Sequence, residues 1–485
     1  MINLRIVARI LSVLAFLEAF LLLITLGVGI LYAETKLYPF VITALLAIAL
    51  GGALMYYAQG APRKITRRDG YLSVALTWVM FSLVGAIPFI LYCEDPRLAV
   101  AVFEATSGFT TTGATALTNL DTMPHSLLFW RSLMHWMGGL GIIFFTVALL
   151  PSISGGSIKL FAAESTGLKI GKLHPRVSTT ARWIWGIYLT LTLLCTGAYI
   201  LAGMSVFDAV NHAMSTIATG GFSTHQASIG YFNSFSIELT AVVFMLMSSI
   251  NFALIYTTLL KRRFREFGRN GELRFMLVVL AITFVVMCGY DVVRGENIFD
   301  SLRTALFTSV SMQSTTGFIT ADYMVRYTPV VWVFILLVGV IGPMAGSTGG
   351  GLKCIRIMTA AKIALSEFRH ILHPRAVLPV RIAGTAATSD VLRTMFAFFV
   401  CYFILLTIAT LSYLLMGLAP IDAFGVAASM LSNVGPAIGH QIGATGSLNV
   451  LPDVGLWLSS VLMLIGRLEI FAILLPFAPA FWKEN

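Results

Sequence analysis

The sequence predicts an all-α polytopic membrane protein with four in-chain copies of one helix–loop–helix unit and an extra N-terminal helix pair. Three observations lead to this fold class. Hydrophobic residues make up 58% of the 485 residues and charged residues only 11%, which is more apolar surface than a water-soluble domain can bury. Apolar stretches of about 20 residues, long enough to cross a hydrocarbon core, recur along the whole chain. The connections on one predicted side of the membrane also share a common pattern.

Ten spans are predicted, joined by short polar connections. Their approximate limits are 4–31, 38–58, 71–93, 126–150, 181–203, 237–260, 273–292, 329–360, 391–417 and 455–480. The first span begins like a secretory signal peptide, but its apolar stretch is too long for one, so we expect a retained helix. The span 329–360 is too long for one straight helix. We expect it to break at 342–351, where five glycines and one proline gather, because both residue types are costly inside a helix.

Basic and acidic residues alternate between successive connections. Arginine and lysine gather at 5–9, 63–68, 159–182, 261–274 and 353–393. Acidic residues gather at 94–121, 208–238, 291–322 and 422–453. Cytosolic connections carry the excess of Lys and Arg, so we expect an even number of crossings, with both termini in the cytosol. The net charge of +10 then reflects topology in a lipid bilayer, and we expect no nucleic-acid partner.

The outer connections of the last four helix pairs form an internal repeat. Each holds a semi-apolar stretch of about a dozen residues, read as a re-entrant half-helix, and then a stretch rich in Thr, Ser and Gly. Aligned without gaps, they share the columns Ala101, Ala209, Ala305 and Ala423; Ser107, Ser215, Ser311 and Ser429; and Gly113, Gly221, Gly317 and Gly435. The glycines are 108, 96 and 118 residues apart, the length of one two-helix unit with its loops. Spacing of this kind indicates a repeat architecture.

The repeats divide the chain into five units. We expect a transmembrane helix pair over 1–69 and pore repeats over 70–156, 157–270, 271–385 and 386–485, the third with a broken second helix. The five cysteines are scattered singly, which suggests neither a disulfide framework nor a zinc site.

Four such segments around one axis have the chemistry of a monovalent-cation pore. Irregular backbone at membrane depth survives only inside protein or beside a watery cavity, and rings of its carbonyl oxygens can replace the water shell of a cation. Glycine suits this position because it tolerates positive φ and adds no side chain. The half-helices would direct the negative ends of their dipoles toward the cation.

At these residues the chain resembles the Trk/Ktr/HKT family of potassium transporters, in which one chain carries four degenerate filter repeats. The resemblance covers residues from about 70 to 480, and the additional N-terminal helix pair is similar to the TrkH branch. The fourth repeat departs most, because Asn433-Val434-Gly435-Pro436 replaces a Thr/Gly core followed by an aromatic residue. Gly220 beside Gly221 leaves the register of the second repeat open by one residue.

The resemblance implies a K⁺-selective filter, with K⁺ as the transported ion and no covalently bound cofactor. The filter residues would be Thr111, Thr112, Gly113, Thr219, Gly220, Gly221, Thr315, Thr316, Gly317, Asn433, Val434 and Gly435. Relatives with serine at the first filter glycine admit Na⁺, so Gly113 favours K⁺. The resemblance also implies a homodimer in the cell inner membrane, with the filter facing outside. Its expected partner is a cytosolic ring of TrkA-type subunits that bind NAD and ATP.

The expected gate lies in the break of the third repeat and at one buried charge. The resemblance implies an intramembrane loop below the filter, made of Gly346, Ser347, Thr348, Gly349, Gly350 and Gly351. Arg467, near the middle of the last predicted span, is either a positive gate residue below the filter or a structural partner of carbonyls or an acidic residue, because a charge at this depth is costly. Glu469 is not its obvious partner. Arg131 is expected to be structural or to snorkel.

Two glycine-rich motifs have simpler explanations. Gly346 to Lys353 looks like a phosphate-binding loop, but Lys353 follows leucine and Cys354 stands where Ser or Thr is required. The stretch 136–141 fits close helix packing through small residues.

Three functions compete at this point. A K⁺ uptake pore is favoured. An H⁺- or Na⁺-coupled K⁺ carrier is the alternative, although parallel repeats with all filters on one face argue against inverted-repeat carriers. A membrane enzyme lacks a convergent set of catalytic residues.

Overall fold

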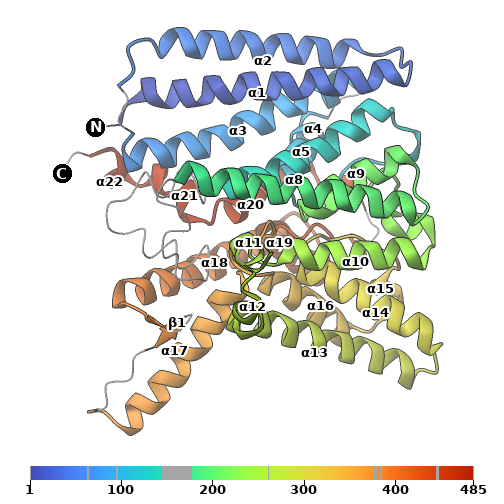
Figure 1. Ribbon diagram of the computed structural model, residues 1–485, viewed down its shortest axis with the longest axis vertical. Coiled ribbons are helices and arrows are strands. Elements are labelled where there is room, and N and C mark those ends of the chain that lie inside the picture. The colour runs from blue at the N-terminus through green and yellow to red at the C-terminus, as the bar shows by residue number, and fades with distance from the viewer. Residues whose placement is uncertain are drawn as a thin grey trace.

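The computed structural model describes residues 2–62, 65–93, 97–144, 177–259, 262–375, 380–382, 385–443 and 447–483. The N-terminal pair is α1 (Leu4–Leu31) and α2 (Tyr38–Tyr57), which lie side by side at the top of Figure 1. The long helices that follow are α3 (Arg67–Tyr92), α5 (His125–Phe144), α8 (Val177–Leu201), α10 (Phe235–Ser249), α13 (Gly271–Val293), α16 (Pro329–Ile341), α17 (Cys354–Leu372), α18 (Ser389–Leu415) and α20 (Asp453–Arg467). This helical architecture confirms the predicted fold class. The basic segment 159–176 lies outside the described residues.

Four helices of 12 to 16 residues, which we name the short helices, occupy the places of the predicted half-helices. They are α4 (Leu98–Phe109), α9 (Val206–Ile217), α14 (Ile298–Gln313) and α19 (Pro420–Ser432). Each follows one of the helices named above and precedes another in the chain, so the described residues repeat one order of elements four times. Where the five predicted units begin and end stays a prediction.

Small elements complete the described chain. These are α11 (Phe252–Leu259), α12 (Phe264–Arg269), α15 (Tyr323–Arg326), α21 (Phe471–Leu474), α22 (Pro479–Trp482), the 3-10 turns η1 (Leu120–Thr122), η3 (Ser228–Phe232), η4 (Leu448–Val450) and η5 (Leu475–Phe477), and the antiparallel pair β1 (Arg381–Ile382) and β2 (Thr385–Ala386). No described strand precedes Gly346, which agrees with rejecting a phosphate-binding loop there.

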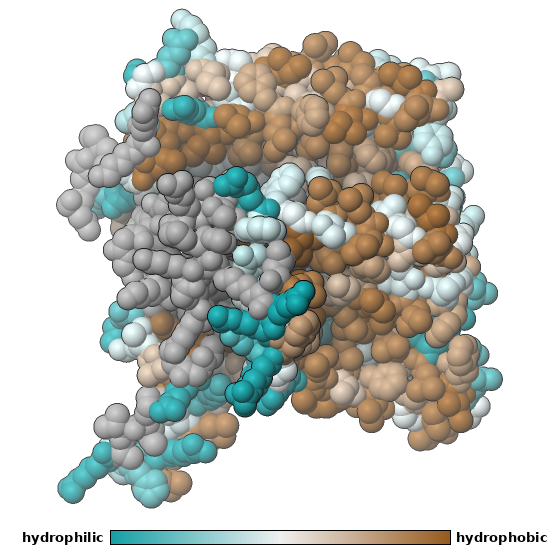
Figure 2. Space-filling view, viewed as in Figure 1, coloured by the Kyte–Doolittle hydropathy of each residue, from teal (hydrophilic) through white to brown (hydrophobic). Residues whose placement is uncertain are grey.

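The surface suits a lipid environment. Most of these helices run across Figure 1, and in the coloured part of Figure 2 hydrophobic residues cover much of the surface, with hydrophilic residues toward the right-hand edge. Among the described residues, six helices are long and apolar enough to cross a membrane, or up to eight if each of two bent pairs counts as one span. Both termini lie on the same side of the bundle (Figure 1), as an even number of crossings requires. The count of ten crossings itself stays a prediction.

Two further predicted spans are also broken, although the sequence did not predict these breaks. The span 237–260 breaks into α10 and α11, bent by 97°, and the span 455–480 breaks after α20, where α20 and the segment from Phe471 to Phe477 are bent by 113°. Arg467 is therefore the last residue of α20 instead of lying within a continuous helix. The expected break of the span 329–360 is present, because α16 ends at Ile341 and α17 begins at Cys354.

Candidate functional site

The four short helices end immediately before the predicted filter residues, and they end in the same way. In each repeat the N–H before the filter glycine donates to the carbonyl of the shared serine: Thr112 to Ser107 (3.0 Å), Gly220 to Ser215 (2.8 Å), Thr316 to Ser311 (3.0 Å) and Val434 to Ser429 (3.1 Å). Such a bond across a helix C-terminus, enclosing a left-handed residue, is a Schellman motif. The serine column of the alignment thus marks the last turn of a helix in all four repeats.

The left-handed residue is two positions before each glycine. Its φ is +50° at Thr111, +53° at Thr219, +57° at Thr315 and +54° at Asn433. Asparagine tolerates this region, but a β-branched residue there is an outlier that costs on the order of 1–3 kcal/mol. Strain of this kind at three equivalent threonines indicates a functional constraint on the backbone of these segments.

The four filter glycines also have positive φ, between +75° and +99°. The residue between each left-handed residue and its glycine does not, so the sign of φ alternates along each segment. This alternation lets successive carbonyl groups face the same side of the chain, whereas in a regular strand they point to opposite sides. A segment that coordinates a cation with consecutive carbonyl oxygens needs this geometry.

The four glycine segments form a closed ring. A methyl group built on a filter glycine would collide with a carbonyl oxygen of the next repeat: on Gly113 it would lie 2.0 Å from Gly220 O, on Gly221 2.0 Å from Thr316 O, on Gly317 2.2 Å from Val434 O, and on Gly435 2.4 Å from Thr112 O. Each contact joins a glycine to the residue before the glycine of the following repeat, and the fourth repeat returns to the first. This equivalence also resolves the register of the second repeat, because Gly221 occupies the filter-glycine position and Gly220 the position before it.

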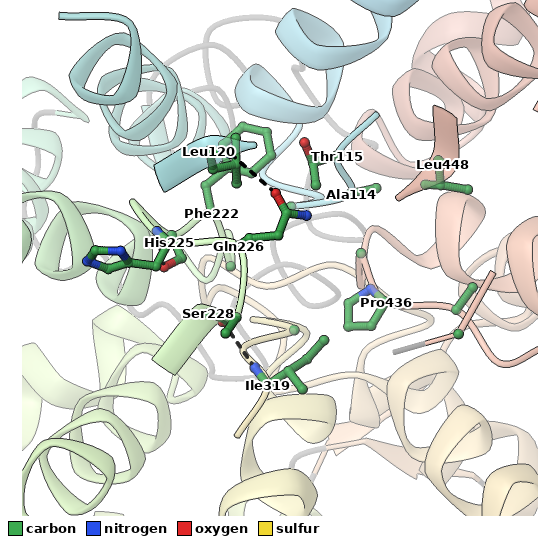
Figure 3. Close-up of a pocket in the computed structure, with 18 of the residues that line it drawn as sticks. Ala114, Thr115, Leu120, Phe222, His225, Gln226, Ser228, Ile319, Pro436 and Leu448 are labelled. Atoms are coloured by element: carbon green, nitrogen blue, oxygen red, sulfur yellow. Dashed lines mark hydrogen bonds between the residues drawn. The ribbon is translucent and has the colours of Figure 1, made fainter. Parts of the chain in front are cut away.

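A cavity lies on one side of this ring. Figure 3 shows its wall, to which all four repeats contribute residues following the glycines, including Ala114, Phe222, Ile319 and Pro436. All four filter glycines line it as well. Hydrogen bonds join neighbouring repeats in the wall, from Leu120 N to Gln226 Oε1 (3.4 Å) and from Ile319 N to Ser228 Oγ (3.2 Å). The ring is therefore accessible from this cavity.

Polar side chains support the segments that follow the glycines. Ser107 Oγ donates to Ala114 O at 2.6 Å, and the equivalent Ser311 Oγ donates to Phe318 O at 2.7 Å. The serine hydroxyls of the first and third repeats thus hold the chain just after the filter glycine. Ser215 contacts His135 instead (3.0 Å), so the second repeat is supported by a different group.

A buried ion pair lies within the first repeat, and its arginine also contacts the second repeat. Arg131 Nη2 lies 2.8 Å from Glu104 Oε1, with side-chain exposures of 1% and 0%. Glu104 also accepts a hydrogen bond from Thr115 Oγ1 at 2.9 Å, and Arg131 donates to Ser223 O at 3.1 Å. Arg131 is therefore structural, as expected, and it does not snorkel. Glu104 was not included among the predicted site residues. Its position, as an acidic residue within an apolar half-helix, was a signal that could have identified it.

The glycine-rich loop 342–353 lies against the opposite side of the ring. Gly350 N donates to Thr315 Oγ1 (2.7 Å), and Gly351 N donates to Ser432 O (2.8 Å). Thr348 Oγ1 donates to Ile217 O (3.0 Å). The loop thus contacts residues before the filter glycines in the second, third and fourth repeats, whereas the cavity is lined by residues at and after the glycines.

Arg467 fixes the same loop. It is 2% exposed, and it donates to Thr348 O at 2.7 Å and to Gly138 O, on α5 of the first repeat, at 3.1 Å. This geometry is compatible with both interpretations of Arg467. It binds backbone carbonyls, as a structural residue would, and it lies beside the loop, as a gate residue would. Glu469 pairs with Arg356, in agreement with the expectation that it is not the partner of Arg467.

Close packing explains the glycines of α5. A methyl group on Gly138 would lie 1.9 Å from Phe109 O, and one on Gly139 would lie 2.9 Å from Ala218 Cα. Both glycines let α5 approach the ends of short helices, as the packing interpretation of 136–141 predicted.

Two further residues that hold the loop are absent from the predicted site. Asn251 Nδ2 donates to Ala345 O at 2.7 Å. Glu272, 3% exposed, accepts from Ala345 N at 2.7 Å and from Ile355 N at 3.1 Å. Asn251 could have been noticed as a polar residue inside the apolar span 237–260, and Glu272 as an acidic residue within a basic connection.

Comparisons with known proteins agree with this geometry. The sequence profile of the TrkH family, described as a cation transport protein, matches residues 37–484. The chain is 38% identical to the Trk system potassium uptake protein TrkH of Escherichia coli (strain K12), over 99% of both chains. It is 34% identical to the Trk system potassium uptake protein TrkG of the same organism, over 99% of both chains.

A solved structure is similar over the same extent. The crystal structure of the potassium transporter TrkH from Vibrio parahaemolyticus matches with a TM-score of 0.91 and 34% identity, covering 99% of this chain and 100% of the other. The resemblance seen at the filter motifs is confirmed over the full length, and the chain belongs to the TrkH family of cation transport proteins.

Proposed function

We propose that this protein takes up K⁺ across the cytoplasmic membrane through a channel-like pore in its four-repeat ring. The observation that carries the proposal is the closed ring, in which each filter glycine faces a backbone carbonyl of the next repeat. Carbonyl rings of this kind replace the hydration shell of a cation while letting it move between sites. Relatives that share 38% identity over their full length are named potassium uptake proteins.

The cation would bind to the backbone of the filter segments at 111–113, 219–221, 315–317 and 433–435. The C-terminal ends of α4, α9, α14 and α19 all stop just before these segments. Helix C-termini carry partial negative charge, which favours a cation over an anion at the ring. The strained threonines support the same assignment, because their cost is explained if the carbonyl direction is what the fold must preserve.

The gate would consist of residues 346–351 and Arg467. The loop lies on the side of the ring opposite the cavity and touches three repeats, and Arg467 connects it to the first. A cation that has passed the ring would meet this loop and a fixed positive charge. Movement of the loop would open the path without disturbing the glycines.

Regulation would come from a cytosolic partner. The family resemblance implies a TrkA-type ring that binds NAD and ATP, a homodimeric transporter, and a multi-pass protein of the inner membrane with its filter facing outside. The basic clusters provide the expected cytosolic surface. A pull-down of the purified transporter with its cognate TrkA-type protein tests the proposed regulation by a partner. Absence of association would contradict it.

Flux measurements in liposomes test the transport function. We expect passive entry of radioactive Rb⁺ down its gradient when the reconstituted protein is the only transporter present. Flux that requires a Na⁺ or H⁺ gradient, or is strictly exchange, would favour the coupled carrier. The family is described as a cation transport protein, and we expect no enzymatic activity.

A further inference from the structure

A buried histidine outside the ring contacts the second repeat of the filter. His135 lies on α5, the second long helix of the first repeat, and its side chain is fully buried. Its Nδ1 lies 3.0 Å from Ser215 Oγ. A methyl group built on Gly220 would lie 2.2 Å from the same nitrogen. The imidazole therefore fills the space behind Gly220, where the equivalent positions of the other repeats carry Thr112, Thr316 and Val434.

The same helix holds the aromatic residue that follows the filter glycine. The Phe222 ring stacks on His135, with ring centroids 4.1 Å apart and an angle of 15° between the planes. The Arg131 guanidinium carbon lies 3.9 Å from the centroid of the same ring. Two groups at these distances cannot share one face of the ring without overlapping, so Phe222 is held between residues one helical turn apart on α5. Figure 3 shows Phe222 in the wall of the cavity.

The position of Gly220 determines one oxygen of the ring. Its carbonyl is the group that faces Gly113 of the first repeat. The imidazole contacts both neighbours of Gly221 in the chain, Gly220 before it and Phe222 after it. Removing it would leave a buried space next to a residue without a side chain, and glycine has the most backbone freedom to move into such a space.

We propose that His135 is a filter-positioning residue, which fixes the Gly220 carbonyl through Gly220 and Phe222 and thereby sets K⁺ over Na⁺ discrimination. The proposal rests on the proposed function, because it assigns selectivity to the same ring. His135 supplies no ligand to the ion. It keeps one of four carbonyls from moving back into the space that the imidazole fills, so that all four oxygens stay at the distance that distinguishes K⁺ from Na⁺.

His135→Ala tests the proposal in liposomes. We expect the K⁺/Na⁺ permeability ratio to fall by about tenfold, equivalent to about 1.4 kcal/mol of discrimination, while K⁺ still passes. His135→Gln retains a hydrogen-bonding group and much of the volume, and should restore most of the ratio. The matched control is Met137→Ala, which removes a buried side chain about 200° around the same helix and should leave the ratio unchanged.

A second pair of variants tests the contact with Gly220 directly. Gly220→Ala places a methyl group against the imidazole and should lower the ratio, and adding His135→Ala should relieve the collision and raise the ratio again. Equal ratios for His135→Ala and Met137→Ala, or strictly additive effects of His135→Ala and Gly220→Ala, would overturn the proposal. Absence of any cation flux through the unmodified protein would instead overturn the proposed function.

Discussion

Gly113 has the least room for a side chain where the first and second repeats meet. Its φ is +78°, and a methyl group there would lie 2.0 Å from Gly220 O. We expect Gly113→Ser to weaken K⁺ over Na⁺ discrimination, because the side chain must displace a ring carbonyl or add a ligand of its own. The measurement is the K⁺/Na⁺ permeability ratio in bilayers. Gly203→Ser is a suitable control, since that glycine also has positive φ but open space around it. An unchanged ratio in Gly113→Ser would show that Gly113 is not part of the filter.

His225, in the cavity wall, lies between two carboxylates. Its Nδ1 lies 2.7 Å from Asp121 Oδ1, and its Nε2 lies 3.6 Å from Asp208 Oδ1. Partial burial lowers the pKa of His225, but hydrogen bonds and charges of Asp208 and Asp121 outweigh it and raise the pKa above its ordinary value. A raised pKa in the folded state means that the stabilisation is complete below the unfolded-state pKa and is lost as pH rises through the folded-state pKa.

Thermal unfolding in detergent checks this titration. Between about pH 6 and about pH 8, where histidine titrates, the unfolding temperature of the unmodified protein should decrease more than that of His225→Gln. His373→Gln is the control, because His373 is exposed near the end of α17. Parallel pH profiles for His225→Gln and the unmodified protein would contradict the assignment.

At the scale of elements, sequence-based prediction missed two of the three helix breaks. The bend between α10 and α11 exists because residues 249–252 bind the loop: Met344 N donates to Ser249 O (3.2 Å) and Phe252 N donates to Gly346 O (3.0 Å). Hydropathy alone predicts an uninterrupted apolar span there, because the loop that binds these residues is about 95 residues away in sequence. The break at 342–351 was predictable because its glycines and proline oppose a helix locally.

Arg467 is the charge that restrains this loop from the end of α20. Its guanidinium donates to Thr348 O and Gly138 O, and no substitution by an apolar residue preserves those bonds. We expect Arg467→Ala to raise basal K⁺ flux in the absence of any partner, because the substitution removes both a fixed positive charge and the hydrogen bond that holds the loop. Arg467→Lys retains the charge and should raise flux less. Flux through Arg467→Ala that equals that of the unmodified protein would favour a purely structural role.

The loop can be shortened without separating its ends. A methyl group built on Gly342 would lie 3.1 Å from Gly351 Cα, and Leu352 N donates to Val340 O at 2.8 Å. The first and last residues of the loop are therefore in contact. Deleting residues 345–350 should leave the K⁺/Na⁺ permeability ratio nearly intact and raise K⁺ flux several-fold, because the ring keeps all its glycines. A deletion that folds but conducts no faster than the unmodified protein would place the gate elsewhere.

At the scale of the whole molecule, the sequence predicts the number of repeats, their order and the filter glycine of three of them, and it leaves the second open between Gly220 and Gly221. The gap-free columns carry this information, since Ser107, Ser215, Ser311 and Ser429 prove to be equivalent helix-terminal residues. The supporting contacts could not be predicted in the same way. Glu104 with Arg131, and His135 with Gly220, join residues from different elements, and such pairs depend on packing that one sequence does not encode as a local pattern.

The ring closes within one chain, which fixes how flux should depend on oligomerisation. The fourth repeat returns to the first through Gly435 and Thr112, so no residue of a second copy is needed to complete it. A variant such as Gly317→Val, in which a branched side chain meets Val434 O, should block its own ring only. When it is mixed with unmodified protein before reconstitution, Rb⁺ flux should fall linearly with the fraction of unmodified chains.

A pore formed between two subunits would behave differently. Only dimers of two unmodified chains would then conduct, and flux would follow the square of their fraction. Dilution of the unmodified protein with Gly203→Val chains is the control, because a side chain at Gly203 meets open space and the mixture should retain full flux. A quadratic decrease with Gly317→Val alone would show that the closed ring of a single chain is not the conducting path, whereas a linear decrease requires one independent pore in each chain of any dimer.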